Sequence, residues 1–183
     1  MTLLTIGVSL FVLSHLIPSV TPLRKALNNS MGEKAYKGVY SLIALTGFGL
    51  MIYGKAYAEF VPVWSPPSFS KHVAWLTMIP ALILVVGANV PGNVKRFTAH
   101  PMMWGVLIWS LAHLFANGDE ASIILFAPLG LLALVIIVGN VRGASRQTEV
   151  LPFSADVKVI VIGLVSYAIF AAAHPYLFKM PAF

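Results

Sequence analysis

The sequence contains no cysteine, and that absence removes several kinds of site at once. Disulfide bonds, cysteine-ligated zinc and iron–sulfur clusters all require a thiol. The absence does not identify a redox compartment, because a chain without cysteine fits either side of a membrane.

Charged residues are scarce as well. They make up 10% of the 183 residues, whereas 58% are hydrophobic, and the mean hydropathy is +0.86. A soluble domain usually has about a quarter charged residues. The apolar stretches leave no room for a soluble domain, so we expect one membrane domain over residues 1–183.

The apolar runs are continuous rather than alternating, as in VAWLTMIPALILVVGANV. Strands of a membrane barrel would alternate in polarity, and lipid otherwise admits only helices, which pair their own backbone groups. The sequence therefore predicts an all-α, polytopic transmembrane helical bundle. Its six expected spans are residues 2–20, 36–57, 71–90, 100–116, 120–140 and 156–178. The first span lacks a basic start and a cleavage site, which favours a retained helix over a signal peptide.

Short polar segments separate the spans. Ser30 and Glu33 have the spacing of a capping box before the second span. Asp119 and Ser154 are expected to cap the fifth and sixth spans. Residues 59–70 hold three prolines and a tryptophan, which predicts an ordered loop at the membrane interface.

The net charge of +6 would suggest nucleic acid in a soluble protein, but here the basic residues lie in the short loops. Their bias predicts topology instead, because cytoplasmic loops are enriched in Lys and Arg. The loops after spans one, three and five carry Arg24, Lys25, Lys34, Lys37, Lys95, Arg96, Arg142, Arg146 and Lys158. The other side carries only Lys55, Lys71 and Lys179. We therefore expect both termini on the periplasmic side and no nucleic-acid partner.

Five histidines lie within or at the ends of the expected spans: His15, His72, His100, His113 and His174. An ionisable residue inside a membrane is costly and is a candidate functional residue. Near span ends, a hydrogen bond to a neighbouring helix explains His72 and His174 equally well. His15 and His113 lie deeper, and two imidazoles on facing helices can hold a haem iron. All six acidic residues fall in loops or first turns, so a carboxylate relay has no residues to use.

The fourth span carries a mixed polar stripe. Helical spacing places Ser110, Trp109, Val106 and Met102 on the face of His113, although ordinary packing with interhelical hydrogen bonds explains such a stripe too. His100 lies thirteen residues earlier, roughly 20 Å along the axis, so it cannot share a site with His113 on a straight helix. Pro at the next position suits a first helical turn.

The segment HPMMWGVLIWSLAHLFANGD, residues 100–119, resembles the NnrU family of bacterial membrane proteins. The stretches SHLIPS at 14–19, GEKAY at 32–36 and WSPP at 64–67 agree with it, as do Arg24 and His72. The resemblance covers nearly the whole chain. It implies an inner-membrane protein associated with denitrification, the reduction of nitrite and nitric oxide.

The same family includes the plant zeta-carotene isomerase, which uses haem b with two histidine axial ligands. One of its motifs matches Ser14 and His15 here, and the other matches the segment from Trp109 to His113. By this resemblance His15 and His113 would ligate the iron, and Trp109 and Ser110 would line the pocket. The isomerase has a redox-linked cysteine where this chain has Ser110, and a serine hydroxyl is a poor haem ligand.

Depth in the membrane gives a different grouping. On the expected boundaries, His15 lies toward the cytoplasmic end and His113 toward the outer end, roughly 14 Å apart in depth. Depth alone pairs His15 with His100, and it groups His72 and His174 with His113. Arg24 also has two candidate roles: it could contact a haem propionate, or it could simply be one of the basic loop residues that set the membrane topology.

Three functions follow from these observations. The first is a haem b protein that supports a nitrite or nitric oxide reductase system by redox sensing, electron transfer or reductase maturation. The second is an isomerase of an apolar, carotenoid-like polyene, against which the missing cysteine counts. The third is a scaffold or transporter without a cofactor, although no internal repeat typical of transporters is present.

Overall fold

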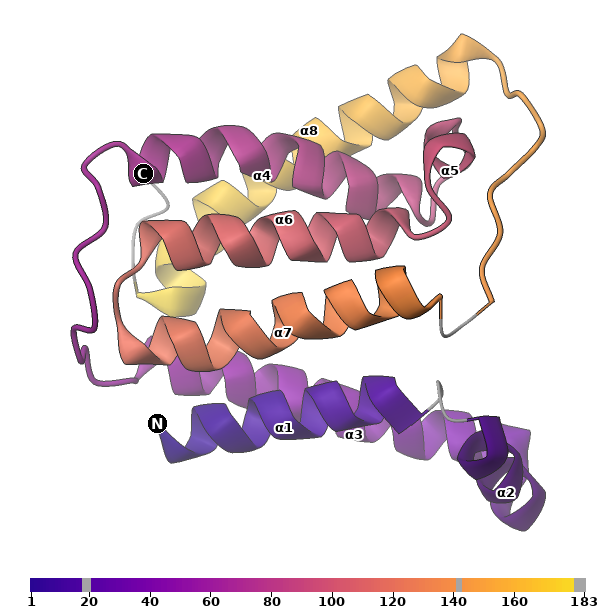
Figure 1. Cartoon of the computed structure of the whole chain (residues 1–183), viewed down its shortest axis with the longest axis horizontal. Helices are drawn as coiled ribbons and strands as arrows, with labels where there is room; N and C mark the ends of the chain where they lie inside the picture. Colours follow the sequence, from indigo (N-terminus) through magenta and orange to yellow (C-terminus); the bar gives the residue numbers. More distant parts are fainter. Residues whose placement is uncertain (18–20, 141–142, 180–183) are drawn as a thin grey trace.

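Six apolar helices form a bundle, and two short helices lie at one of its ends (Figure 1). The fold comes from a computed structural model that describes residues 1–17, 21–140 and 143–179. In these ranges the helices are α1 (Thr2–Leu16), α2 (Thr21–Met31), α3 (Glu33–Ala56), α4 (Ser70–Gly87), α5 (Val94–Phe97), α6 (Pro101–Ala116), α7 (Glu120–Gly139) and α8 (Phe153–Phe178). The all-α prediction is confirmed.

The six expected spans correspond to the six apolar helices. Four of these, α3, α4, α7 and α8, are long and apolar enough to cross a membrane. The other two, α1 and α6, are apolar but have 15 and 16 residues. At 1.5 Å per residue each is about 23 Å long, less than the roughly 30 Å hydrocarbon core. The first span was expected to reach residue 20, whereas α1 ends at Leu16 and residues 18–20 lie outside the described ranges.

Helix α7 lies at the centre of the bundle. It is packed on one side by α1 and on another by α6, and half of its most apolar window is buried inside the protein. Leu125, Phe126 and Leu129 of this helix form a core with Leu4 and Val8 of α1. Helix α8 crosses α4 obliquely and also contacts α3 (Figure 1).

Two of the three expected helix caps are wrong. Ser30 lies inside α2, where its hydroxyl donates to the Leu27 carbonyl at 3.0 Å, and α3 instead follows Gly32, whose φ is 82°. Ser154 lies inside the first turn of α8, because Pro152 starts this helix one turn earlier than expected. Helix α2 itself was expected to be a loop. Its mixed composition, apolar on one face and basic at Arg24 and Lys25, suits a helix lying at an interface.

Helices α1 and α3 approach each other through glycines. A Cβ on Gly54 would lie 2.6 Å from the Leu4 backbone nitrogen, and one on Gly7 would lie 2.7 Å from that of Met51. Gly47 faces Gly7 in the same contact, with a Cβ only 2.9 Å from the Gly7 carbonyl oxygen. Small residues at a helix interface permit this close backbone approach. In lipid such packing matters because the hydrophobic effect does not drive helices together.

The two ends of the bundle differ in charge. The C-terminal ends of α1, α4 and α7 lie at the end that also holds α2 and α5 (Figure 1). Eight of the nine basic residues counted above on one side follow these helices, and Arg142 lies outside the described residues. The C-terminal ends of α3, α6 and α8 lie at the opposite end. The periplasmic orientation of the termini stays a prediction.

The α1–α3 contact gives a direct test with a control on the same helix. Gly47→Ala should lower the free energy of unfolding by about 1–3 kcal/mol, because the added methyl overpacks against the α1 backbone. Gly49→Ala meets nothing within 4 Å and should leave stability unchanged or slightly higher. Unfolding in mixed detergent and SDS measures both variants, and equal stabilities would contradict the packing.

Candidate functional site

His113 occupies the last turn of α6, at the end of the bundle opposite α2 and α5. Its Nδ1 lies 2.8 Å from the Trp109 carbonyl oxygen, one turn earlier in the helix. A carbonyl can only accept, so Nδ1 carries the proton and the Nε2 lone pair is left for another partner. Histidines that ligate metals are commonly oriented by this kind of bond from the second ring nitrogen.

Flat rings from three helices surround the His113 imidazole. Phe126 of α7 lies 4.6 Å from it between ring centroids, and Trp109 lies 5.5 Å away. His174 of α8 lies 6.5 Å away, with its ring plane at 23° to that of His113. The structure thus brings together His113 and Trp109, which were expected at one site, and it places His174 beside them, as the grouping by depth had predicted.

A buried ion pair lies at the same end of the bundle. Lys55, near the end of α3, has 6% of its surface exposed, and Asp119, which precedes α7, has 2%. Lys55 Nζ donates to Asp119 Oδ1 and to Ser122 Oγ, each at 2.8 Å. The Ser122 hydroxyl and backbone N–H both donate to the Asp119 carboxylate, so Lys55, Asp119 and Ser122 are joined in one buried hydrogen-bond network.

Asp119 therefore has two roles. It caps α7, as expected, by accepting the Ser122 N–H at 2.9 Å, and it also neutralises the Lys55 ammonium. Burial by itself raises the pKa of the Asp119 carboxyl, but the hydrogen bonds from Lys55 and Ser122 and the Lys55 charge outweigh it. The pKa of Asp119 consequently lies below its ordinary value.

The loop between α3 and α4 covers the turn that holds Asp119. Backbone N–H groups of Val63 and Trp64 donate to the Gly118 carbonyl at 2.7 and 3.1 Å, and the Glu120 N–H donates to the Val61 carbonyl at 2.9 Å. Any Cβ at Gly118 would collide with the Trp64 carbonyl oxygen, so only glycine fits there. The expected loop at residues 59–70 is present up to Phe69, where α4 follows, and backbone hydrogen bonds hold it to the turn of Asp119. Its position at the membrane interface stays a prediction.

His15 lies at the other end of the bundle, in the last turn of α1. Its Nδ1 lies 2.7 Å from the Phe11 carbonyl oxygen, and its ring stacks on Phe11 with centroids 4.1 Å apart. With Tyr40 and Phe48 it lines a shallow groove of about 320 Å³ between α1 and α3.

The remaining candidates have separate surroundings. Ser110 is fully buried, and its hydroxyl donates to the Phe126 carbonyl across the α6–α7 contact. His100 directly precedes Pro101 at the start of α6, as expected, and its Nε2 lies 2.8 Å from Asn140 Oδ1. His72 is exposed near the start of α4, with its ring against Trp75.

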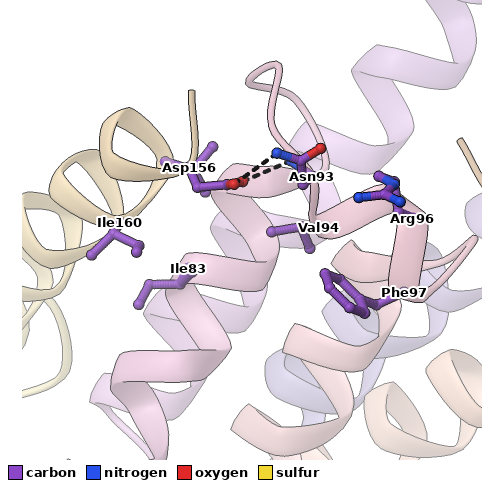
Figure 2. A pocket seen from close by; sticks show the side chains of 8 residues that line it. Ile83, Asn93, Val94, Arg96, Phe97, Asp156 and Ile160 are labelled. Carbon is purple, nitrogen blue, oxygen red and sulfur yellow. Dashed lines mark hydrogen bonds between the residues drawn. The ribbon is translucent and has the colours of Figure 1, made fainter. Parts of the chain in front are cut away.

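A second cavity, of about 370 Å³, lies between α4, α5 and α8 at the end of the bundle that holds α2 (Figure 2). Asn93 donates to the Asp156 carboxylate twice at 2.7 Å, from its backbone and its side chain. Its amide also exchanges hydrogen bonds with the Leu151 backbone at 2.9 Å. Figure 2 shows this clamp beside apolar walls such as Ile83 and Ile160, with Arg96 at the edge. It fastens the start of α8 to the turn before α5.

Comparison with known proteins identifies the family. The family profile described as NnrU protein matches residues 3–182, almost the full length. The chain belongs to the NnrU family. This family is linked to denitrification. No curated protein and no solved structure matches the chain.

Sequence reasoning on this NnrU chain missed the ion pair. Lys55 was counted with the topology residues and Asp119 with the helix caps. The signal was present, since Lys55 falls inside the second expected span, where an uncompensated cation is costly. Among the described residues, no three His, Asp or Glu side chains gather as ligands for a bare metal ion.

Removing one charge of the pair should be severely destabilising. We expect Lys55→Met to lower the free energy of unfolding by about 3–5 kcal/mol, because it leaves the Asp119 carboxylate buried without its counter-ion. Lys71→Met, which changes an exposed lysine at the same end of the bundle, should change it by less than about 0.5 kcal/mol. Equal effects in SDS unfolding would show that the pair is not a stabilising element.

The pair also predicts a pH dependence. Because folding lowers the pKa of Asp119, its contribution to stability is complete above its ordinary value of 3.8 and is lost as the pH falls through the lower folded value. Asp119→Asn should therefore show a smaller loss of stability than the wild type as the pH falls below about 4. Unfolding midpoints measured across this range test the sign, and a variant with the wild-type slope would contradict it.

Proposed function

We propose that this NnrU protein binds haem b in the bundle and supports the reduction of nitrite and nitric oxide, and that His113 would hold the iron. The observation that carries the proposal is the His113 ring itself. Its Nδ1 is committed to the Trp109 carbonyl, its Nε2 keeps a lone pair, and aromatic rings flank it. A neutral imidazole in an apolar, half-buried setting is a good ligand for haem iron.

The chain's residues suit such a group in three ways. A haem needs only one or two protein ligands, so the lack of a three-residue metal cluster among the described residues is no obstacle. Trp109 and Phe126 pack edge to face beside His113 and make its surroundings apolar. The Lys55–Asp119 pair anchors the turn that follows the helix of His113. A bound haem supplies one-electron chemistry, which redox sensing, electron transfer and reductase maturation all require.

The pairing of His15 with His113, implied by the zeta-carotene isomerase, stays a prediction. The helix ends that carry these two residues lie at opposite ends of the bundle (Figure 1). The proposal concerns His113 alone. It therefore holds whether or not His15 is a second ligand of the iron.

The optical spectrum of the detergent-purified protein, expressed with haem supplied, tests the proposal. We expect a Soret band in the wild type and sharp reduced bands after dithionite addition. His113→Ala should lose or strongly weaken these bands, whereas the exposed His72→Ala should keep them. A folded wild type without a Soret band would overturn the proposal.

The role in denitrification has its own test. In a denitrifying host that lacks its own copy of the gene, the wild-type chain should restore anaerobic growth on nitrite. His113→Ala should fail to do so at equal membrane abundance, while His72→Ala should succeed. Full restoration by His113→Ala would separate the physiological role from this histidine.

A further inference from the structure

We infer that the cavity between α4, α5 and α8 binds an anionic phospholipid, with its phosphate at Arg96 and an acyl chain against Ile83 and Ile160. The cavity lies at the end of the bundle that holds α2 and α5, whereas His113 lies at the opposite end. The inference is therefore independent of the proposed haem binding.

The lining of this cavity divides into a polar edge and an apolar floor (Figure 2). Arg96, Asn93 and Asp156 form the polar edge, and Ile83 and Ile160 belong to the apolar floor. Ile160 comes four residues after Asp156 along α8, which at 1.5 Å per residue places it about 6 Å further into the bundle. The floor thus lies deeper in the membrane than the edge, in the same order as the acyl chains and the headgroup of a lipid.

Close contacts between the surrounding elements fix the shape of the cavity. A Cβ on Gly163 would lie 2.7 Å from the Ile83 side chain, and one on Gly92 would lie 2.8 Å from the Val159 side chain. Helix α8 therefore rests directly on α4 and on the turn before α5, and two hydrogen bonds of 2.7 Å from Asn93 hold its first turn there. The volume of about 370 Å³ falls within the range of ligand sites.

The polar edge has positive charge to offer. Lys95 and Arg96 are the basic residues in the last turn of α5, and Arg96 is exposed. Within the described ranges, neither of them forms an ion pair with a carboxylate. Asp156 on the same edge already accepts hydrogen bonds from Asn93 with both of its oxygens. A guanidinium binds phosphate through two parallel hydrogen bonds, so Arg96 suits a headgroup phosphate.

The two halves of the cavity together select the class of ligand. Basic pockets between membrane-spanning helices bind anionic headgroups, whereas Lys95 and Arg96 would repel the cation of a zwitterionic headgroup. A soluble anion would leave the apolar floor uncovered, together with Phe97, which lines the cavity and is 76% exposed. A molecule with an anionic head and an apolar chain uses both halves, and the surrounding bilayer contains such molecules.

Native mass spectrometry of the detergent-purified chain, with lipid added, tests the headgroup. We expect the wild type to retain one palmitoyl-oleoyl phosphatidylglycerol in clear preference to the phosphatidylcholine with the same chains. Arg96→Gln should lower the association constant for phosphatidylglycerol about fivefold, the factor that one basic residue contributes near a membrane surface. Lys34→Gln removes an equal charge from an exposed position at the same end of the bundle and should keep the wild-type value.

A second pair of variants tests the acyl chain. Ile160→Trp enlarges a side chain of the cavity wall and should weaken the binding of both lipids. Ile169→Trp makes the same change nine residues later on α8, about half a turn around the helix, at a position that is 61% exposed. It should leave binding unchanged. Circular dichroism and gel filtration establish that each variant folds.

Three results would overturn the inference. The first is equal retention of phosphatidylglycerol and phosphatidylcholine by the wild type, and the second is the same association constant in Arg96→Gln and Lys34→Gln. The third is binding of inorganic phosphate to the delipidated wild type without retention of phosphatidylglycerol, which would indicate a site for a soluble anion.

Discussion

The buried ion pair between Lys55 and Asp119 is the interaction on which one whole end of the bundle depends. It links the end of α3 to the turn between α6 and α7, 64 residues later in the sequence, and to the first turn of α7 that follows this turn. Two charges in an apolar interior persist only if each is fully compensated, and here Ser122 completes the set. The loop between α3 and α4 is held to the same turn by backbone hydrogen bonds at Gly118 and Glu120. His113, four residues before Asn117 and six before Asp119, takes its position from this anchored turn.

The fold could be read from the sequence to a large extent. Six apolar stretches predicted six helices, because lipid-like composition leaves few alternatives. Some predicted helix boundaries were wrong. Ser30 donates to the Leu27 carbonyl and does not cap a helix, and residues 21–31 form a helix in place of the expected loop. Such choices depend on the tertiary surroundings of each turn, which a single sequence does not contain.

The candidate site could be predicted only in part. Helical spacing found His113 with Trp109, since both lie on one helix. His174 lies sixty-one residues later on α8. Depth in the membrane grouped it with His113, and the packing of α8 shows that the two rings are 6.5 Å apart. Helical spacing placed Ser110 on the same face as His113, but its hydroxyl donates a hydrogen bond to the Phe126 carbonyl.

The central proposal is that His113 of α6, which lies just before the anchored α6–α7 turn, holds a haem iron. The optical spectrum of the purified protein, expressed with haem supplied, tests it most directly. We expect a Soret band in the wild type and in His72→Ala, and its loss or strong weakening in His113→Ala. A Soret band of wild-type strength in a folded His113→Ala would contradict the proposal.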